Sequence, residues 1–275
     1  MKSKFEMSED FLKNDNILNC PICGERLLFL DNCLKCGKHS FDISRKGTVN
    51  LVYSKHYKNS KIYNSELFKN RREFIIGGFY FKLYKFISDI LNDRFSSEGT
   101  ILDLGCGEGS HSKFILDLLK FDYYKYYGFD YAKDAIKLAS DYINYNRFYF
   151  LGDVNKIPIL DNSIDIILDM FSPFNEKEVK RIIKDSGVFI KVSPGKNYLK
   201  ELRDVLNMEE YNNENDVFDN LQKRFKKIDK YNLNYRVQIN EDSFQNLVKM
   251  TPAQKKTSST ISFVTIDLNV YVIGI

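Results

Sequence analysis

The pattern of apolar and polar positions predicts an α/β fold over most of the chain. Seven segments have the pattern of strands: five short apolar runs and, near the carboxyl end, two stretches in which apolar and polar residues alternate. The runs cover residues 101–104, 126–130, 148–153, 163–173 and 188–192, and the alternating stretches cover 231–239 and 261–275. Helical patterns separate several of these strands, which is typical of a parallel sheet. We expect the last two strands to form an antiparallel pair.

The segments outside these strands carry further signals. Residues 64–92 have apolar side chains at helical spacing and predict a helical stretch with one buried face. Residues 176–183 predict an amphipathic crossover helix that is stopped at Gly187. The acidic, asparagine-rich stretch 209–219 predicts a flexible insertion, and the polar residues 1–14 predict a peripheral segment.

A glycine-rich turn follows the first predicted strand of the sheet. Asp103 lies at the end of that strand, and Gly105, Gly107 and Gly109 follow at alternate positions. Glycine is required where the backbone turns sharply and a cofactor approaches closely. The G-x-G-x-G spacing differs from that of dinucleotide-binding enzymes, and Asp103 is suited to accept a hydrogen bond from a cationic amino group. The motif resembles that of class I methyltransferases, which bind S-adenosylmethionine; a purely structural turn is the alternative.

Three further acidic residues lie at the ends of predicted strands. Asp130, 25 residues beyond Gly105, is placed to accept both ribose hydroxyls of a nucleoside, to cap the following helix, or to do both. Asp153 follows the third strand, where the resemblance implies a contact with the adenine amino group. Asp169 lies in the fourth strand, whose end faces the transferred methyl group in such folds. The order of these strands favours a Rossmann-like methyltransferase sheet.

Composition places few limits on function. The chain has 275 residues, 43% of them hydrophobic, which suits one large domain with a small one. A formal net charge of +4 permits nucleic-acid binding without requiring it. The first residues lack the apolar core of a signal peptide, and no apolar run reaches about 18 residues. We therefore expect a cytoplasmic protein without a membrane span.

Four of the five cysteines lie within residues 20–36 and predict a metal site. Cys20 and Cys23 form one C-x-x-C pair, and Cys33 and Cys36 form a second, which His39 follows. Two such pairs in a cytoplasmic chain favour tetrahedral zinc over a redox dithiol. The segment offers five ligands for four places, so the set is either the four cysteines or three cysteines with His39.

The metal pattern and several later motifs resemble those of the bacterial 23S rRNA guanine-N1 methyltransferases, the group that includes the tylosin-resistance methyltransferases. The resemblance extends from about residue 20 to residue 256, and its segments are 20–23, 36, 39–42, 47–51, 71–80, 103–109, 193–202 and 250–252. It implies a class I methyltransferase fold, with a seven-stranded sheet and a small N-terminal zinc-binding module. We place the module at residues 1–52, a helical linker at 53–99 and the S-adenosylmethionine-dependent methyltransferase domain at 100–275.

The resemblance also implies site residues. The implied cofactor contacts are Tyr80, Asp103, Gly105, Gly107, Glu108, Asp130, Asp153 and Tyr198, and the implied zinc ligands are Cys20, Cys23, Cys36 and His39. The chain departs from the family pattern in the metal segment, because two residues rather than three separate Cys36 from His39. We favour His39 as the fourth ligand, since Cys36 keeps the family's distance from Cys23, and Cys33 is the alternative. Tyr198 stands where the family commonly has a histidine.

The implied reaction is methyl transfer from S-adenosylmethionine to N1 of a guanine in a 23S rRNA hairpin. Asp169, at a position where the family can have a basic residue, is the acidic candidate to accept the N1 proton; its alternative role is that of a cap or a salt-bridge partner. Phe171 and Phe174 are candidates to stack on the extruded base.

RNA contact is predicted for Arg71 and Arg72 and for the basic, aromatic-containing loop 54–61, against the alternative of a solvated surface. We consider a homodimer as well. Two other functions stay open. One is a small-molecule methyltransferase with a structural zinc module, and the other is an RNA-binding adaptor whose cofactor fold is vestigial.

Overall fold

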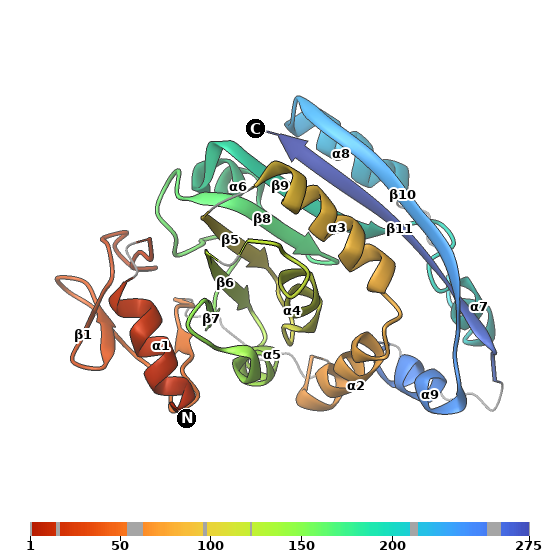
Figure 1. Cartoon of the computed structure of the whole chain (residues 1–275), viewed down its shortest axis with the longest axis horizontal. Helices are drawn as coiled ribbons and strands as arrows, with labels where there is room; N and C mark the ends of the chain where they lie inside the picture. Colours follow the sequence, from red (N-terminus) through yellow and green to blue (C-terminus); the bar gives the residue numbers. More distant parts are fainter. Residues whose placement is uncertain are drawn as a thin grey trace.

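The computed structural model of the chain describes residues 2–14, 17–53, 63–95, 98–121, 123–209, 214–251 and 260–274. These residues form a large mixed sheet with helices on both faces and, near the amino end, a small three-stranded sheet beside helix α1 (Figure 1). No helix among them is long and apolar enough to cross a membrane.

The large sheet has the strand order β10-β11-β9-β8-β5-β6-β7-β4. Its strands are β4 Val49–Asn50, β5 Gly99–Leu104, β6 Tyr124–Asp130, β7 Arg147–Leu151, β8 Ile164–Met170, β9 Ile183–Pro194, β10 Lys227–Gln238 and β11 Phe263–Gly274. The pairs from β4 to β9 are parallel, and β11 is antiparallel to both β9 and β10. The seven predicted strands and the antiparallel end pair are therefore confirmed. An eighth strand that the sequence did not predict, β4, is added at the edge beside β7.

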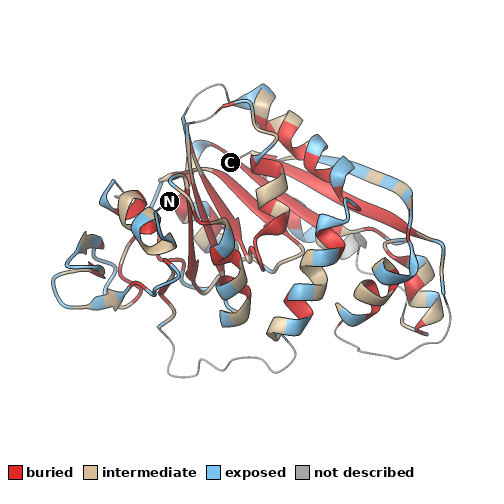
Figure 2. Ribbon diagram, turned by 60° about the horizontal axis from the view of Figure 1, so that its bottom comes forward, coloured by how far each residue is buried: buried red, intermediate tan, exposed pale blue. Residues whose placement is uncertain are grey.

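Alternate residues of the central strands enter two hydrophobic cores, one on each face of the sheet. Ile101 belongs to one core and its neighbour Leu102 to the other. The helices α3 Phe81–Arg94, α4 Ser110–Leu116 and α9 Glu241–Lys249 cover the first core, and α1 Lys4–Lys13, α6 Glu176–Ile182 and α8 Glu214–Arg224 cover the second. Figure 2 shows the buried strands between helices. Burial of both faces explains why these strands are continuous apolar runs.

The helical stretch predicted over residues 64–92 is two helices in the structure. Helix α2, Ser65–Ile76, ends at Gly77, and α3 begins at Phe81. Gly78 has a φ of +84°, and a Cβ at Gly77 would lie 2.5 Å from the Phe79 ring. The two glycines therefore break the helix, although the apolar spacing continues through them. Two further helices, α5 Lys133–Ala139 and α7 Lys200–Val205, lie after β6 and β9.

Two other predictions about local structure were wrong. Gly187 lies inside β9 and does not stop α6, which ends at Ile182. The register between β8 and β9 shifts near this point, and a Cβ at Gly187 would lie 2.9 Å from the Lys184 carbonyl oxygen. A glycine is therefore needed at this irregularity in the strand. The insertion predicted over 209–219 is helical from Glu214 onward, where α8 begins; residues 210–213 lie outside the described residues.

The N-terminal segment is part of the core, which corrects the prediction that residues 1–14 are peripheral. Ser3 and Glu6 form a capping box that starts α1, and Phe11 and Leu12 on this helix are each 2% exposed. The Phe11 ring contacts Tyr127 at 5.1 Å and Phe148 at 5.6 Å between ring centroids. Helix α1 therefore packs on the strands β6 and β7.

Backbone hydrogen bonds also join the N-terminal residues to the large sheet. The three-stranded sheet, β1 Leu28–Leu30, β2 Cys33–Lys35 and β3 Ser40–Asp42, is followed by β4, which pairs with β7. Asn19 N–H donates to the Pro158 carbonyl (3.0 Å), and Leu160 N–H donates to the Ile17 carbonyl (2.8 Å). The N-terminal residues are thus joined to the sheet through β4, and through Ile17 and Asn19 to the connection between β7 and β8.

Replacement of Phe11 by Ala is expected to destabilise the whole sheet, because the ring fills a site between α1 and two strands. We expect a loss of about 3–5 kcal/mol in the free energy of unfolding, measured by urea denaturation. Tyr123→Ala is the control, since that side chain is 75% exposed and its loss should change the value by less than about 0.5 kcal/mol. Equal stability of the two variants would show that α1 does not support the sheet.

Candidate active site and metal centre

The glycine turn after β5 is shaped by its close contact with the loop after β8. Gly105, Gly107 and Gly109 have φ values of +68°, +57° and +86°, in the left-handed region that favours glycine. A Cβ at Gly105 would lie 2.1 Å from Ser172 Oγ, so no other residue fits there without moving the loop. The turn leads directly into α4, at the carboxyl edge where α/β sheets bind their ligands.

A cavity of about 760 Å³ opens at this edge and is lined by parts of the chain that are far apart in sequence. Eight of the predicted site residues line it: Tyr80, Gly105, Gly107, Glu108, Asp130, Asp153, Phe171 and Tyr198. The structure therefore brings most of the predicted cofactor set together. Asp103 and Asp169 do not line the cavity and are buried beside it.

Asp130 lies at the end of β6 and accepts hydrogen bonds from two backbone amides. Gly107 N–H donates to Oδ2 (2.9 Å), and Ala132 N–H donates to Oδ1 (2.7 Å). Burial raises the pKa of Asp130, and these amides oppose the rise. The carboxylate thus fixes the glycine turn to the start of α5, and with about four acceptor sites it keeps capacity for a ligand hydroxyl.

Asp103 is a buried acid with one oxygen that lacks a partner. Tyr126 OH donates to Oδ2 (3.0 Å), whereas Oδ1 has no hydrogen-bond partner among the described residues. Burial raises the pKa of Asp103 to about 7. A cationic group close to this carboxylate would favour its ionised form. The residues at the turn therefore fit the positively charged amino group of an amino-acid ligand.

Glu108 and Arg72 form a partly buried ion pair beneath the turn. Arg72 Nε donates to Glu108 Oε2 (2.8 Å), and Arg72 Nη1 donates to Asp141 Oδ2 (2.7 Å). Ser110 Oγ also donates to Glu108 (2.7 Å). The prediction that Arg72 faces RNA or solvent is therefore wrong, because its side chain is 15% exposed and engaged with two acids. Arg71 does line the cavity, near the rings of Tyr63 and Phe68.

Aromatic side chains form one wall of the cavity. The hydroxyl groups of Tyr80 and Tyr198 are hydrogen-bonded at 2.5 Å, and the Phe171 ring stacks on Tyr198 at 5.8 Å. His111, which the sequence analysis did not select, lines the same wall, and its Nδ1 is 2.8 Å from Tyr84 OH. Burial lowers the pKa of His111 to about 3, so the ring is neutral at physiological pH. Its position directly after the glycine turn was the signal that could have found it.

Asp169 forms the salt bridge that was the alternative to a catalytic role. Its Oδ2 accepts from Lys191 Nζ (2.9 Å), and its Oδ1 accepts from Ser172 N–H (3.2 Å). Lys191 Nζ also donates to the Ser172 carbonyl (2.8 Å). Phe171, between Asp169 and Ser172, has a φ of +63°, which is strained for a bulky residue. The ion pair therefore holds a strained loop in place. Lys191 carried no motif that could have identified it.

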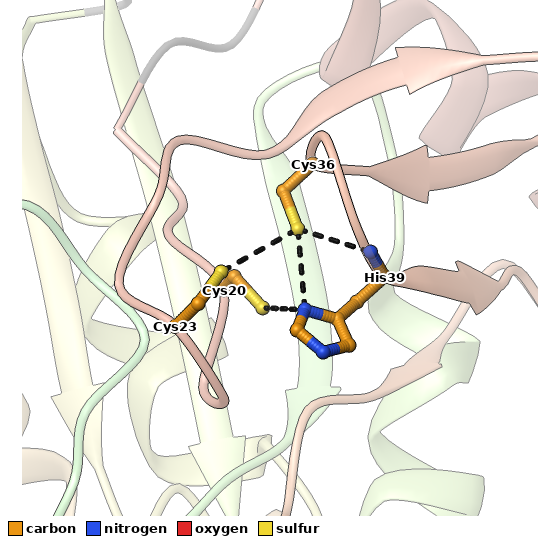
Figure 3. A group of neighbouring side chains, drawn as sticks. All are labelled: Cys20, Cys23, Cys36 and His39. Carbon is orange, nitrogen blue, oxygen red and sulfur yellow. Dashed lines mark hydrogen bonds between the residues drawn. The ribbon is translucent and has the colours of Figure 1, made fainter.

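Four metal-binding side chains converge in the N-terminal module (Figure 3). The ligand atoms of Cys20, Cys23, Cys36 and His39 all lie within 4.8 Å of one another. The Cys23 and Cys36 sulfurs are 3.6 Å apart, and His39 Nδ1 is 3.5 Å from the sulfurs of both Cys20 and Cys36. A tetrahedral zinc with Zn–S bonds of about 2.3 Å needs separations close to these. Cys33 lies outside the cluster, where its Sγ donates to the Asp31 carbonyl.

Known families match both parts of this architecture. A family described as "Methyltransferase domain" matches residues 95–250, and one described as "RlmA, N-terminal", a zinc ribbon, matches residues 18–61. The first covers more than half of the chain and includes the glycine turn, and the second includes the four converging ligands.

Two named relatives match most of the chain. A Bacillus subtilis (strain 168) protein named "Putative 23S rRNA (guanine-N(1)-)-methyltransferase YxjB" is 37% identical over 207 residues, covering 70% of this chain and 69% of that protein. The "23S rRNA (guanine(748)-N(1))-methyltransferase" of Streptomyces fradiae is 25% identical over 243 residues, covering 86% of this chain and 85% of that one. The chain therefore belongs to the 23S rRNA (guanine-N1)-methyltransferase family and is an S-adenosylmethionine-dependent methyltransferase.

Proposed function

We propose that this enzyme methylates N1 of a guanine in 23S rRNA. The observation that carries the proposal is that one continuous framework holds both a Cys₃His cluster and a cavity at the glycine turn, as expected for the family to which the chain belongs. A small-molecule acceptor is less favoured, because both named relatives are rRNA methyltransferases by name. The cytoplasm as the site of action and a homodimer both stay predictions.

The cofactor residues divide by the part of S-adenosylmethionine that each would hold. Asp130 would accept hydrogen bonds from the ribose hydroxyls, and Asp153 would contact the adenine. The turn at Gly105 and Gly107, with Asp103 buried beside it, would hold the amino-acid end. The bound cofactor supplies a methyl group already activated by a sulfonium centre. What the protein adds is alignment of that methyl group with the acceptor nitrogen.

Asp169 acts in this proposal as a positioning residue and not as the acceptor of the N1 proton. Protein donors occupy both of its oxygens, and its side chain is fully buried. It holds the loop on which Phe171 lies, and Phe171, together with Tyr198, forms the aromatic wall at the methyl end of the cavity. The strain at Phe171 is maintained because Asp169 and Lys191 both bind Ser172.

The N-terminal module, residues 1–52 in our division, would bind zinc and present RNA-binding residues. Zinc would be held by Cys20, Cys23, Cys36 and His39. The basic loop 54–61, our main candidate for RNA contact, lies outside the described residues, within the linker that we place at residues 53–99; the methyltransferase domain follows over 100–275.

We expect one zinc ion per chain, bound without Cys33. Metal analysis of purified protein should give about one equivalent. His39→Ala should lower the zinc content, because it removes one of four converging ligands, and Cys33→Ser should leave it unchanged. Loss of zinc from the Cys33 variant, with retention in the His39 variant, would reverse the ligand assignment.

Asp130→Ala is expected to weaken S-adenosylmethionine binding, because the ribose would lose two charge-assisted hydrogen bonds. Each hydrogen bond should contribute about 1.5–3 kcal/mol to the binding free energy. We expect a value near the lower limit, because the carboxylate lies beside an open cavity. Calorimetric titration measures the change. Asp134→Ala, on the following helix and outside the cavity lining, is the matched control. Equal affinities of the two variants would remove Asp130 from the cofactor site.

The acceptor is tested by transfer of labelled methyl groups to rRNA. Purified enzyme and labelled S-adenosylmethionine are incubated with protein-free 23S rRNA and with assembled subunits, and the RNA is then digested to nucleosides. We expect the label in 1-methylguanosine. Label in another nucleoside would reject the base assignment, and turnover on a small molecule with no labelled RNA would reject the RNA substrate.

A further inference from the structure

A second cavity, of about 450 Å³, adjoins the cofactor cavity. Both are lined by the loop residues Phe171, Ser172 and Pro173 and by Pro194. The remaining walls of the second cavity come from Phe174, from residues 191–193 of β9, and from Val217, Asn220, Leu221 and Arg224 on α8. We call this cavity the α8 pocket. Phe171, the predicted site residue that lines both cavities, marks where the α8 pocket meets the cofactor cavity.

The floor of the α8 pocket carries polar groups whose hydrogen-bonding capacity is incompletely used. Ser193 is 5% exposed, and its hydroxyl has no partner among the described residues. Lys191 Nζ donates to Asp169 and to Ser172, which leaves one of its three N–H groups. Buried polar groups are usually paired, so these groups indicate a polar ligand.

The walls of the pocket are mainly apolar and aromatic. The Phe174 ring lies 5.4 Å from Lys191 Nζ and 5.9 Å from the Arg224 guanidinium carbon. Val217, Leu221 and Pro194 supply aliphatic surface. A planar base suits such walls, and donors from Lys191 and Ser193 suit a carbonyl oxygen on its edge. The volume lies within the range of about 300–1,000 Å³ that is usual for ligand pockets.

We propose that the α8 pocket receives the acceptor guanine and that Lys191 and Ser193 bind its O6; this inference rests on the proposed function. In the reaction, the N1 proton first passes to solvent water, which leaves a negative charge shared between N1 and O6, where the Lys191 cation stabilises it. N1 then forms a bond to the methyl carbon while the carbon–sulfur bond breaks, and the electron pair of that bond stays on sulfur. Asp169 then serves the reaction by positioning Lys191.

A blocking substitution tests the location of the pocket. Asn220 is exposed on α8 and lines the pocket, so Asn220→Trp should fill its mouth without disturbing the core. We expect methyl transfer to 23S rRNA to fall roughly 100-fold, because a displaced base loses its alignment with the methyl group, while affinity for S-adenosylmethionine is unchanged. Asp219→Trp, exposed on the same helix but outside the pocket, is the control and should transfer at the wild-type rate.

Two further variants test the polar contacts. Ser193→Ala removes a hydroxyl that has no hydrogen-bond partner among the described residues, so a structural role predicts no effect. We expect a roughly tenfold loss of kcat/KM for RNA, the size of one hydrogen bond. Asp169→Asn combined with Lys191→Met removes the cation without leaving an unpaired buried charge. Its control combines Asp165→Asn with Lys184→Met, because Lys184 bonds both oxygens of Asp165 at 2.9 Å between the same two strands.

The double variant Asp169→Asn with Lys191→Met should have a strongly lowered kcat, whereas the control double variant, Asp165→Asn with Lys184→Met, should not. Both should bind S-adenosylmethionine with equal affinity. The inference is overturned if Asn220→Trp and Ser193→Ala both transfer methyl groups to 23S rRNA like the wild type. Failure of the proposed function is a different result: the wild-type enzyme itself would then place no label in 1-methylguanosine.

Discussion

The contact between Gly105 and Ser172 is the constraint on which the active site depends. It brings the turn after β5 against the loop after β8, with room for only a hydrogen atom on Gly105. The Asp130 carboxylate holds the turn by accepting a hydrogen bond from the Gly107 amide. Asp169 and Lys191 hold the loop by their hydrogen bonds to Ser172. Residues 171–173 of this loop line both cavities.

The N-terminal module is built into the methyltransferase sheet and is not a separate body on a flexible tether. Strand β4 extends the sheet, and Asn19, next to the ligand Cys20, donates to Pro158. The chain from Asp153 to Asn155, which lines the cofactor cavity, lies just before that carbonyl. The predicted metal site therefore lies in a segment that is hydrogen-bonded close to the predicted adenine side of the cofactor.

The sequence predicted what depends on local patterns and could not predict what depends on register between distant segments. The seven strands and the glycine turn have signals within a few residues, so they were found. The pairing of Asp169 with Lys191 depends on which residues of β8 and β9 lie opposite each other, and the added strand β4 has only two residues. The preference for His39 over Cys33 came from the family's distance between Cys23 and Cys36, and the position of Cys33 on β2, outside the cluster, agrees with it. The break between α2 and α3 was signalled by Gly77 and Gly78 but was masked by continuous apolar spacing.

A map of modified nucleosides in 23S rRNA from cells that lack the gene for this protein tests the guanine-N1 assignment. We expect one 1-methylguanosine to disappear in these cells, to return when the wild-type protein is supplied, and to stay absent when the Asp130→Ala variant is supplied at the same level. An unchanged set of 1-methylguanosines in the cells without the gene would contradict the assignment.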